Sequence, residues 1–62
     1  MPIIHVNLLH GRTVEAKRRF SKELTDLACD CLDVKPDQVR IIFSEMSRED
    51  YAIAGTLVCD RD

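Results

Sequence analysis

A proline directly follows the initiator methionine, and this placement is the feature of the sequence that most suggests chemistry. If Met1 is removed, Pro2 becomes the chain terminus and carries a secondary amine. An α-amino group has a reference pKa of about 7.7 to 8, and apolar surroundings or nearby cations lower that pKa because they disfavour the ammonium form. A rigid ring amine that is neutral at working pH is a good general base. The alternative interpretation is that Pro2 is an accident of the second codon.

Two arginines suggest that the substrate is acidic. Arg12 lies in a loop after one aliphatic segment, and Arg40 lies within a second, strongly apolar one. A guanidinium group in such a segment needs a partner, because an unpaired buried charge costs several kcal/mol. Its two-pronged donor geometry matches a carboxylate. The alternatives for Arg40 are a solvent-facing strand position and a structural pair with Asp37 or Glu45.

The remaining titratable side chains carry weaker signals. His5 could act as a second acid or base and His10 could line the mouth of a site, but surface or interface positions are the simpler interpretation for both. The three cysteines are an odd number without paired Cys/His spacing. This pattern excludes a full disulfide framework and a structural zinc site, so we expect no metal.

The elements that must position these residues follow from the hydrophobic pattern. Over residues 3–9, aliphatic side chains recur at every second position, and this pattern predicts a strand. Thr13 is a predicted N-cap, and the apolar residues after it follow helical spacing, which predicts an amphipathic helix that ends before Pro36. The apolar stripe of this helix consists of Phe20, Leu24, Leu27, Ala28 and Cys31.

The second half of the chain predicts more β structure. Residues 39–44 alternate again and predict a second strand, and residues 51–59 predict a short strand or hairpin. A strand, about twenty helical residues and another strand form a right-handed βαβ crossover with parallel strands. One helix covers only one face of that sheet. Because parallel sheets are normally buried on both faces, we expect another subunit to cover the second face.

The size and charge of the chain limit the classes of function that it can have. A chain of 62 residues without disulfides or a metal favours oligomerisation. Nine basic against eleven acidic residues and 5% aromatics argue against nucleic-acid binding. No apolar run approaches the roughly 20 residues that span a bilayer, and the N-terminus has no charged region typical of a signal peptide. We therefore expect one cytoplasmic domain over residues 1–62 with no membrane partner.

Five features occur in order along nearly the whole chain. They are Pro2 with the strand behind it, the Leu9-x-Gly11-Arg12-Thr13 turn, the capped helix, Val39-Arg40-Ile41-Ile42 with Glu45-Met46, and Tyr51-x-Ile53-x-Gly55. In this order and spacing, from Pro2 to about Leu57, the sequence resembles the 4-oxalocrotonate tautomerase family. The resemblance implies an α/β (α+β) subunit with a single βαβ unit and a C-terminal β-hairpin. It also implies dimers with a four-stranded sheet that assemble into a homohexamer, a trimer of dimers.

The resemblance further implies a cofactor-independent tautomerase of unsaturated 2-oxo and 2-hydroxydienoic acids such as 2-hydroxymuconate. Pro2 matches the amine that moves a proton between the dienol oxygen and the carbon chain. Arg12 matches the arginine that binds the distal carboxylate of the substrate. Arg40 matches the arginine that meets the proximal carboxylate and the 2-oxo oxygen, where charge builds up in the transition state. Because the sites of this family lie at subunit contacts, these residues are expected to come from more than one chain.

Leu9, Tyr51 and Ile53 complete the predicted substrate-binding residues. Tyr51 stands where the family usually has a phenylalanine, and its hydroxyl needs a hydrogen-bond partner. Ile53 stands where related dehalogenases carry a water-activating glutamate, which argues against hydrolytic dehalogenation. Ala52 and Ala54 replace glycines of the family, and alanine costs energy at any of these positions that needs a positive φ.

A second function is also compatible with the sequence. The chain could be a non-catalytic or promiscuous member of the family, for example one subunit type of a hetero-hexamer, in which a retained Met1 blocks Pro2. A retained methionine converts the Pro2 nitrogen into a non-basic tertiary amide. The state of the N-terminus therefore distinguishes the two functions.

Overall fold

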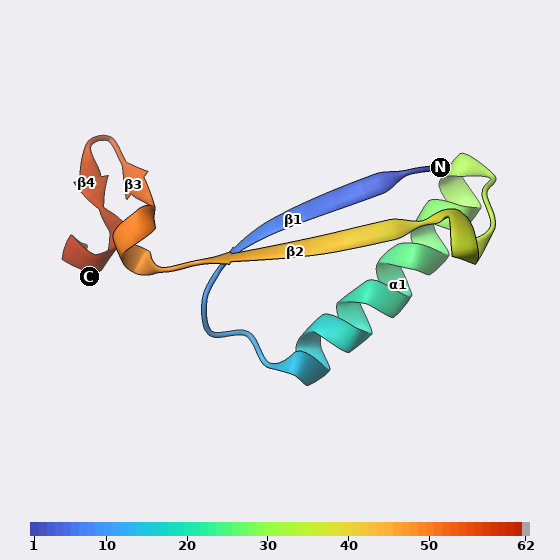
Figure 1. Cartoon of the computed structure of the whole chain (residues 1–62), viewed down its shortest axis with the longest axis horizontal. Helices are drawn as coiled ribbons and strands as arrows, with labels where there is room; N and C mark the ends of the chain where they lie inside the picture. Colours follow the sequence, from blue (N-terminus) through green and yellow to red (C-terminus); the bar gives the residue numbers. More distant parts are fainter. Residues whose placement is uncertain (62) are drawn as a thin grey trace.

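A parallel two-stranded sheet and one long helix form the body of the subunit (Figure 1). The computed structural model describes residues 1–61. Strand β1 (Ile3–Leu9) leads through a loop to α1 (Val14–Leu32), and a short 3-10 turn η1 (Pro36–Gln38) precedes β2 (Arg40–Met46). The βαβ unit and the parallel pairing confirm the predicted topology.

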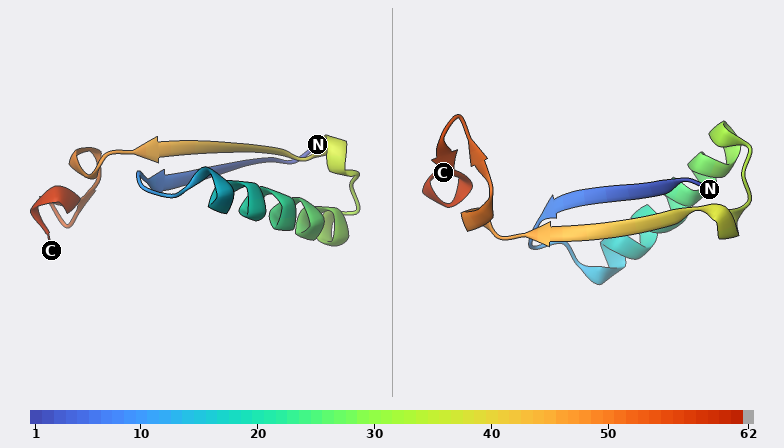
Figure 2. Two further views of the ribbon diagram at one scale, coloured as in Figure 1. Left: turned by 90° about the horizontal axis from the view of Figure 1, so that it is seen from below. Right: turned by 45° about the horizontal axis from the view of Figure 1, so that its top comes forward.

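Side chains alternate between the two faces of this sheet. Val6 pairs with Phe43 in the strand register, and both line a groove against α1. Figure 2 shows α1 along this face, while no described element covers the opposite face. On that open face, Ile3 is 64% exposed and Ile42 is 47% exposed. The sheet therefore has one covered face and one apolar face that nothing in residues 1–61 covers.

Helix α1 begins and ends at residues suited to those positions. The Thr13 hydroxyl accepts a hydrogen bond from the Ala16 amide at 3.0 Å, so the predicted N-cap is confirmed. Asp33 adopts the left-handed conformation at the C-terminus, with a φ of 56°. Of the predicted stripe, Ala28 is buried but Phe20 is 47% exposed, and Cys31 is exposed rather than part of a core. Within the described residues, no helix is long and apolar enough to cross a membrane.

A small hairpin follows the sheet, as the sequence predicts. The 3-10 turn η2 (Arg48–Asp50) leads into β3 (Ala52–Ile53), which pairs with β4 (Thr56–Leu57) before a last 3-10 turn η3 (Val58–Asp60). The hairpin projects beyond the C-terminal end of β2 (Figures 1 and 2). The Val58 amide donates to the Tyr51 carbonyl at 2.8 Å, and Arg48 Nη2 donates to the Val58 carbonyl at 3.0 Å.

The isolated subunit is extended and exposes more surface than a compact chain of its size. Its radius of gyration is 14.8 Å, whereas a compact chain of this length has about 11 Å. Its accessible surface is 5016 Å², against about 4,100 Å² for a compact monomer of this mass. Among the described residues, only Ala28 and Val58 are buried apolar residues. One chain therefore lacks a core of its own, which supports the expectation that it needs partners.

The hairpin turn contains a strained alanine. Ala54 has a φ of 54° and Gly55 a φ of 84°, as a two-residue type I′ turn requires. Because an L-residue in this region costs about 1 kcal/mol or more, Ala54→Gly is expected to stabilise the hairpin by about 1 kcal/mol. We expect hydrogen exchange at the Val58 amide to slow about five-fold. Ala52→Gly is the control, because Ala52 does not have a positive φ, and it should not slow this exchange.

Candidate active site

Pro2 and Arg40 lie side by side at the start of the sheet. The Arg40 amide donates to the Pro2 carbonyl at 3.0 Å, and Arg40 pairs with Ile3 in the strand register. The Arg40 guanidinium donates to the backbone carbonyl of Asp37. One end of the sheet thus brings together the candidate base and one of the two candidate arginines.

Arg12 lies at the other end of β1. It follows the strand in the loop to α1 and lines a groove of about 310 Å³ between the sheet and the helix. The walls of this groove are largely apolar and include Phe20 and Phe43, whose ring centroids are 6.1 Å apart. β1 has seven residues and therefore spans about 23 Å. Within one chain, Arg12 is too far from Pro2 to bind the same small substrate.

The other predicted substrate-binding residues also lie away from Pro2. Leu9 pairs with Met46 at the C-terminal ends of the two strands. Tyr51 and Ile53 lie still farther along, at the hairpin, where they are 42% and 43% exposed. A single chain therefore brings the backbones of Pro2 and Arg40 together at the start of the sheet. The loop between β1 and α1 and the hairpin lie beyond the other end of the strands (Figure 1).

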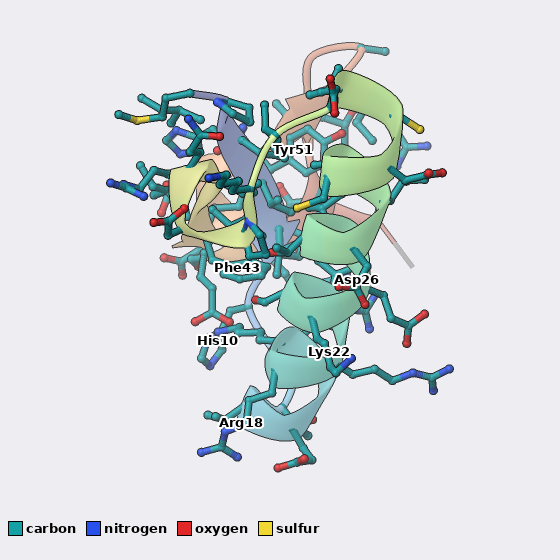
Figure 3. All side chains as sticks on the ribbon, turned by 90° about the vertical axis from the view of Figure 1, so that its right-hand side faces the viewer. His10, Arg18, Lys22, Asp26, Phe43 and Tyr51 are labelled. Atoms are coloured by element: carbon teal, nitrogen blue, oxygen red, sulfur yellow. The ribbon has the colours of Figure 1, made fainter. Side chains whose placement is uncertain are left out.

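Glu45 forms a cluster with Lys17 and His10 that the hydrophobic pattern of the sequence does not predict. Glu45 Oε2 lies 2.7 Å from Lys17 Nζ, and Glu45 Oε1 lies 3.6 Å from His10 Nδ1. Figure 3 shows His10 beside the first turns of α1. The hydrogen bond from Lys17 lowers the pKa of Glu45, an effect that outweighs the opposing effect of burial. Glu45 is therefore a carboxylate at neutral pH.

This cluster excludes one of the alternatives for Arg40, a structural pair with Glu45. Glu45 pairs with Lys17 and His10 rather than with Arg40. The two residues lie five positions apart on β2, so their side chains point to opposite faces of the sheet. The alternation of β2 was the available signal, because it places Glu45 on the face that carries Phe43 and α1.

His5 has a partner on the open face of the sheet. Its Nε2 lies 2.6 Å from the Ser44 hydroxyl across the two strands. This contact agrees with the interpretation of His5 as a surface or interface residue. Among residues 1–61, no three His, Cys, Asp or Glu side chains are grouped closely enough to hold a metal ion.

Comparisons with known proteins agree with this architecture. A family model described as tautomerase enzyme matches residues 2–61. The 2-hydroxymuconate tautomerase of Bacillus subtilis (strain 168) is 29% identical over 62 residues, which cover 100% of both chains.

Two solved structures are also similar. A 4-oxalocrotonate tautomerase isozyme from Methylibium petroleiphilum is 47% identical, with a TM-score of 0.93 over 97% of this chain and 94% of that chain. A heterohexamer 4-oxalocrotonate tautomerase from Chloroflexus aurantiacus J-10-fl is 24% identical and has the same fold, with a TM-score of 0.92 over 100% of both chains. The chain belongs to the tautomerase family, a family of isomerases, and is a homologue of the 4-oxalocrotonate tautomerases.

Proposed function

We propose that this chain is a cofactor-independent tautomerase of unsaturated 2-oxo and 2-hydroxydienoic acids such as 2-hydroxymuconate. The observation that carries the proposal is the backbone hydrogen bond from the Arg40 amide to the Pro2 carbonyl at the start of the sheet. It places the backbone of the residue that carries the potential amine base beside the backbone of Arg40, whose guanidinium suits a 2-oxo carboxylate. Membership of the tautomerase family and similarity to a 2-hydroxymuconate tautomerase support the same reaction class.

The proposed reaction is a proton transfer in which Pro2 acts first as base and then as acid. After removal of Met1, the Pro2 nitrogen takes the proton from the dienol hydroxyl. The O–H electrons form the carbonyl bond, the double bonds shift along the chain, and a carbon of the chain takes the proton back from the Pro2 ammonium. Negative charge accumulates on the 2-oxygen during the transfer, and the Arg40 guanidinium stabilises it.

The proposed site requires more than one chain. Arg12 would bind the distal carboxylate, yet the length of β1 separates it from Pro2 of the same chain. We propose a homohexamer, a trimer of dimers with four-stranded sheets, in which the Arg12 loop and the hairpin of one chain approach Pro2 of another. Leu9, Tyr51 and Ile53 then form apolar walls of the site. The uncovered sheet face and the excess surface of the isolated chain support this assembly.

Arg12→Ala tests the proposed role in binding the distal carboxylate. A lost bidentate ion pair weakens binding by about 2 kcal/mol, so the KM for 2-hydroxymuconate is expected to rise about thirty-fold, with a smaller change in kcat. Steady-state kinetics with a 2-hydroxydienoate that lacks the second carboxylate provide the control. For that substrate, the KM of the variant should match that of the unmodified protein, and an equal loss for both substrates would contradict the assignment.

A further inference from the structure

We infer that Glu45 is a positioning residue for Arg12: its salt bridge to Lys17 and its contact with His10 hold the loop that carries Arg12 in its binding conformation. This inference rests on the proposed function, in which Arg12 binds the distal carboxylate of the substrate. Glu45 itself does not touch the substrate in this account. It acts through the loop between β1 and α1.

The contacts of Glu45 lie on both sides of Arg12. His10 precedes Arg12 by two residues and Lys17 follows it by five, so one carboxylate on β2 contacts the chain where it leaves β1 and where it enters α1. The His10 amide also donates to the Met46 carbonyl at 2.8 Å, which fixes the start of the loop to β2. The segment is held at its helix end by the Lys17–Glu45 salt bridge and at its strand end by the His10–Met46 hydrogen bond, to which the contact of the exposed His10 imidazole with Glu45 adds.

The loop needs such a restraint because its own residues do little to fix its conformation. Gly11, directly before Arg12, has a φ of 132°, a conformation that L side chains rarely adopt, and its position has open space around it. Arg12 itself forms no salt bridge within the described residues. The direction of its side chain therefore depends on how the flanking backbone is held.

The Lys17–Glu45 pair is shielded enough to supply this restraint. The Glu45 side chain is 29% exposed and that of Lys17 is 24% exposed. In the Arg19–Glu23 pair on the outer face of α1, the two side chains are 83% and 63% exposed. Solvent screens an exposed pair strongly and a partly covered pair less. Lys17 also lines the same groove as Arg12, so the pair is adjacent to the proposed binding group.

The sign of a kinetic effect separates positioning from a direct charge effect. Glu45→Gln removes a negative charge near an anion-binding residue, which by electrostatics alone lowers the KM for a dianionic substrate. Loss of positioning instead raises that KM. We expect Glu45→Gln to raise the KM for 2-hydroxymuconate about five-fold and to leave kcat within about two-fold. The KM for a 2-hydroxydienoate without the second carboxylate should not change.

Three further variants complete the experiment. Glu23→Gln is the matched control, because it breaks a 2.6 Å ion pair on α1 that does not contact the loop, and it should leave both KM values unchanged. Glu45→Asp keeps the charge and should recover part of the affinity. Lys17→Met breaks the same pair from the helix, but it also removes a cation from the groove that Arg12 lines, which by itself raises the KM for a dianion. Its readout is therefore hydrogen exchange at the His10 amide, expected to accelerate about five-fold, and it serves as the test if Glu45→Gln does not fold.

A measurement without substrate tests the loop directly. In Glu45→Gln, hydrogen exchange at the His10 amide is expected to accelerate about five-fold, because the loop opens more easily. In Glu23→Gln it should not change. Both measurements use the intact assembled protein.

The outcomes distinguish this inference from the proposed function. If Arg12→Ala raises the KM for 2-hydroxymuconate but Glu45→Gln leaves it unchanged or lowers it, Glu45 does not position Arg12 and the inference is overturned. An equal rise for both substrates in Glu45→Gln also overturns it, since the effect would then be a general structural one. If Arg12→Ala itself has no effect, the assignment of Arg12 fails and the role of Glu45 fails with it.

Discussion

Pro2→Ala is expected to lower the turnover of 2-hydroxymuconate by about a hundred-fold or more. Alanine leaves an amine at the chain terminus once Met1 is removed, but it removes the ring that fixes the nitrogen relative to the sheet. The base then samples many orientations, and the proton transfer loses the alignment that makes it efficient. Steady-state kinetics at neutral pH measure this loss.

Two controls make the Pro2 result interpretable. Intact mass must establish that Met1 is absent from both proteins, since a retained methionine blocks the nitrogen whatever residue follows. The Arg40 amide donates to the carbonyl of residue 2 rather than to its ring, so the variant can keep the strand pairing, which circular dichroism checks. Turnover equal to that of the unmodified protein would eliminate Pro2 as the base.

Arg40→Ala is expected to lower kcat for 2-hydroxymuconate about a hundred-fold, because in the proposed mechanism the guanidinium stabilises charge that develops only during the reaction. Arg40→Lys keeps the charge but not the planar two-pronged geometry, and it should recover only part of the rate. Kinetics with saturating substrate separate this effect on kcat from weaker binding.

Arg18→Gln is the control for the arginine series. Arg18 pairs with Glu15 on α1, and its side chain is 68% exposed, so its loss should leave kcat unchanged. The Arg40 guanidinium also donates to the Asp37 carbonyl, and thermal unfolding checks that the Arg40 variants remain folded. A variant that stays folded and keeps full kcat would remove Arg40 from the mechanism.

The fold of the subunit could be predicted from local patterns. Alternation defines β1, and the Thr13 cap with the apolar stripe defines α1, because these signals depend on neighbours in the sequence. The parallel pairing follows from the length of the helix between the strands. The positive φ of Ala54, by contrast, could not be predicted from local patterns. The family resemblance indicates only that an alanine replaces a glycine there, and the two-residue turn of the hairpin shows that this position has a positive φ.

The site could be predicted only in part, because it depends on contacts that local patterns do not encode. Pro2 and Arg40 are neighbours because the strand register pairs Arg40 with Ile3 and the Arg40 amide donates to the Pro2 carbonyl. The predicted βαβ topology places the starts of the two parallel strands at the same end of the sheet. A pair of Arg40 with Glu45, one of the alternatives that proximity in sequence allows, is wrong, because the two side chains lie on opposite faces of β2 and Glu45 pairs with Lys17. Arg12 and Tyr51 lie far from Pro2 in one chain, so their proposed roles depend on subunit contacts.

The small size of the chain links its stability to its chemistry. Ile3 and Ile42 on the open face are exposed in one subunit, and apolar surface of this kind is stabilised when another copy covers it. The same association is what the proposed site needs, since one chain carries its candidate groups at opposite ends. Assembly and catalysis are therefore expected to be lost together.

The most direct test of the central claim compares two forms of the same chain, one without Met1 and one that retains it, each identified by intact mass. Their turnover of 2-hydroxymuconate is measured at equal concentration. If the Pro2 amine is the base, the form without Met1 is active and the form that retains it is slower by about a hundred-fold or more. Equal turnover by the two forms would contradict the account, because the nitrogen of Pro2 is not basic when Met1 remains attached.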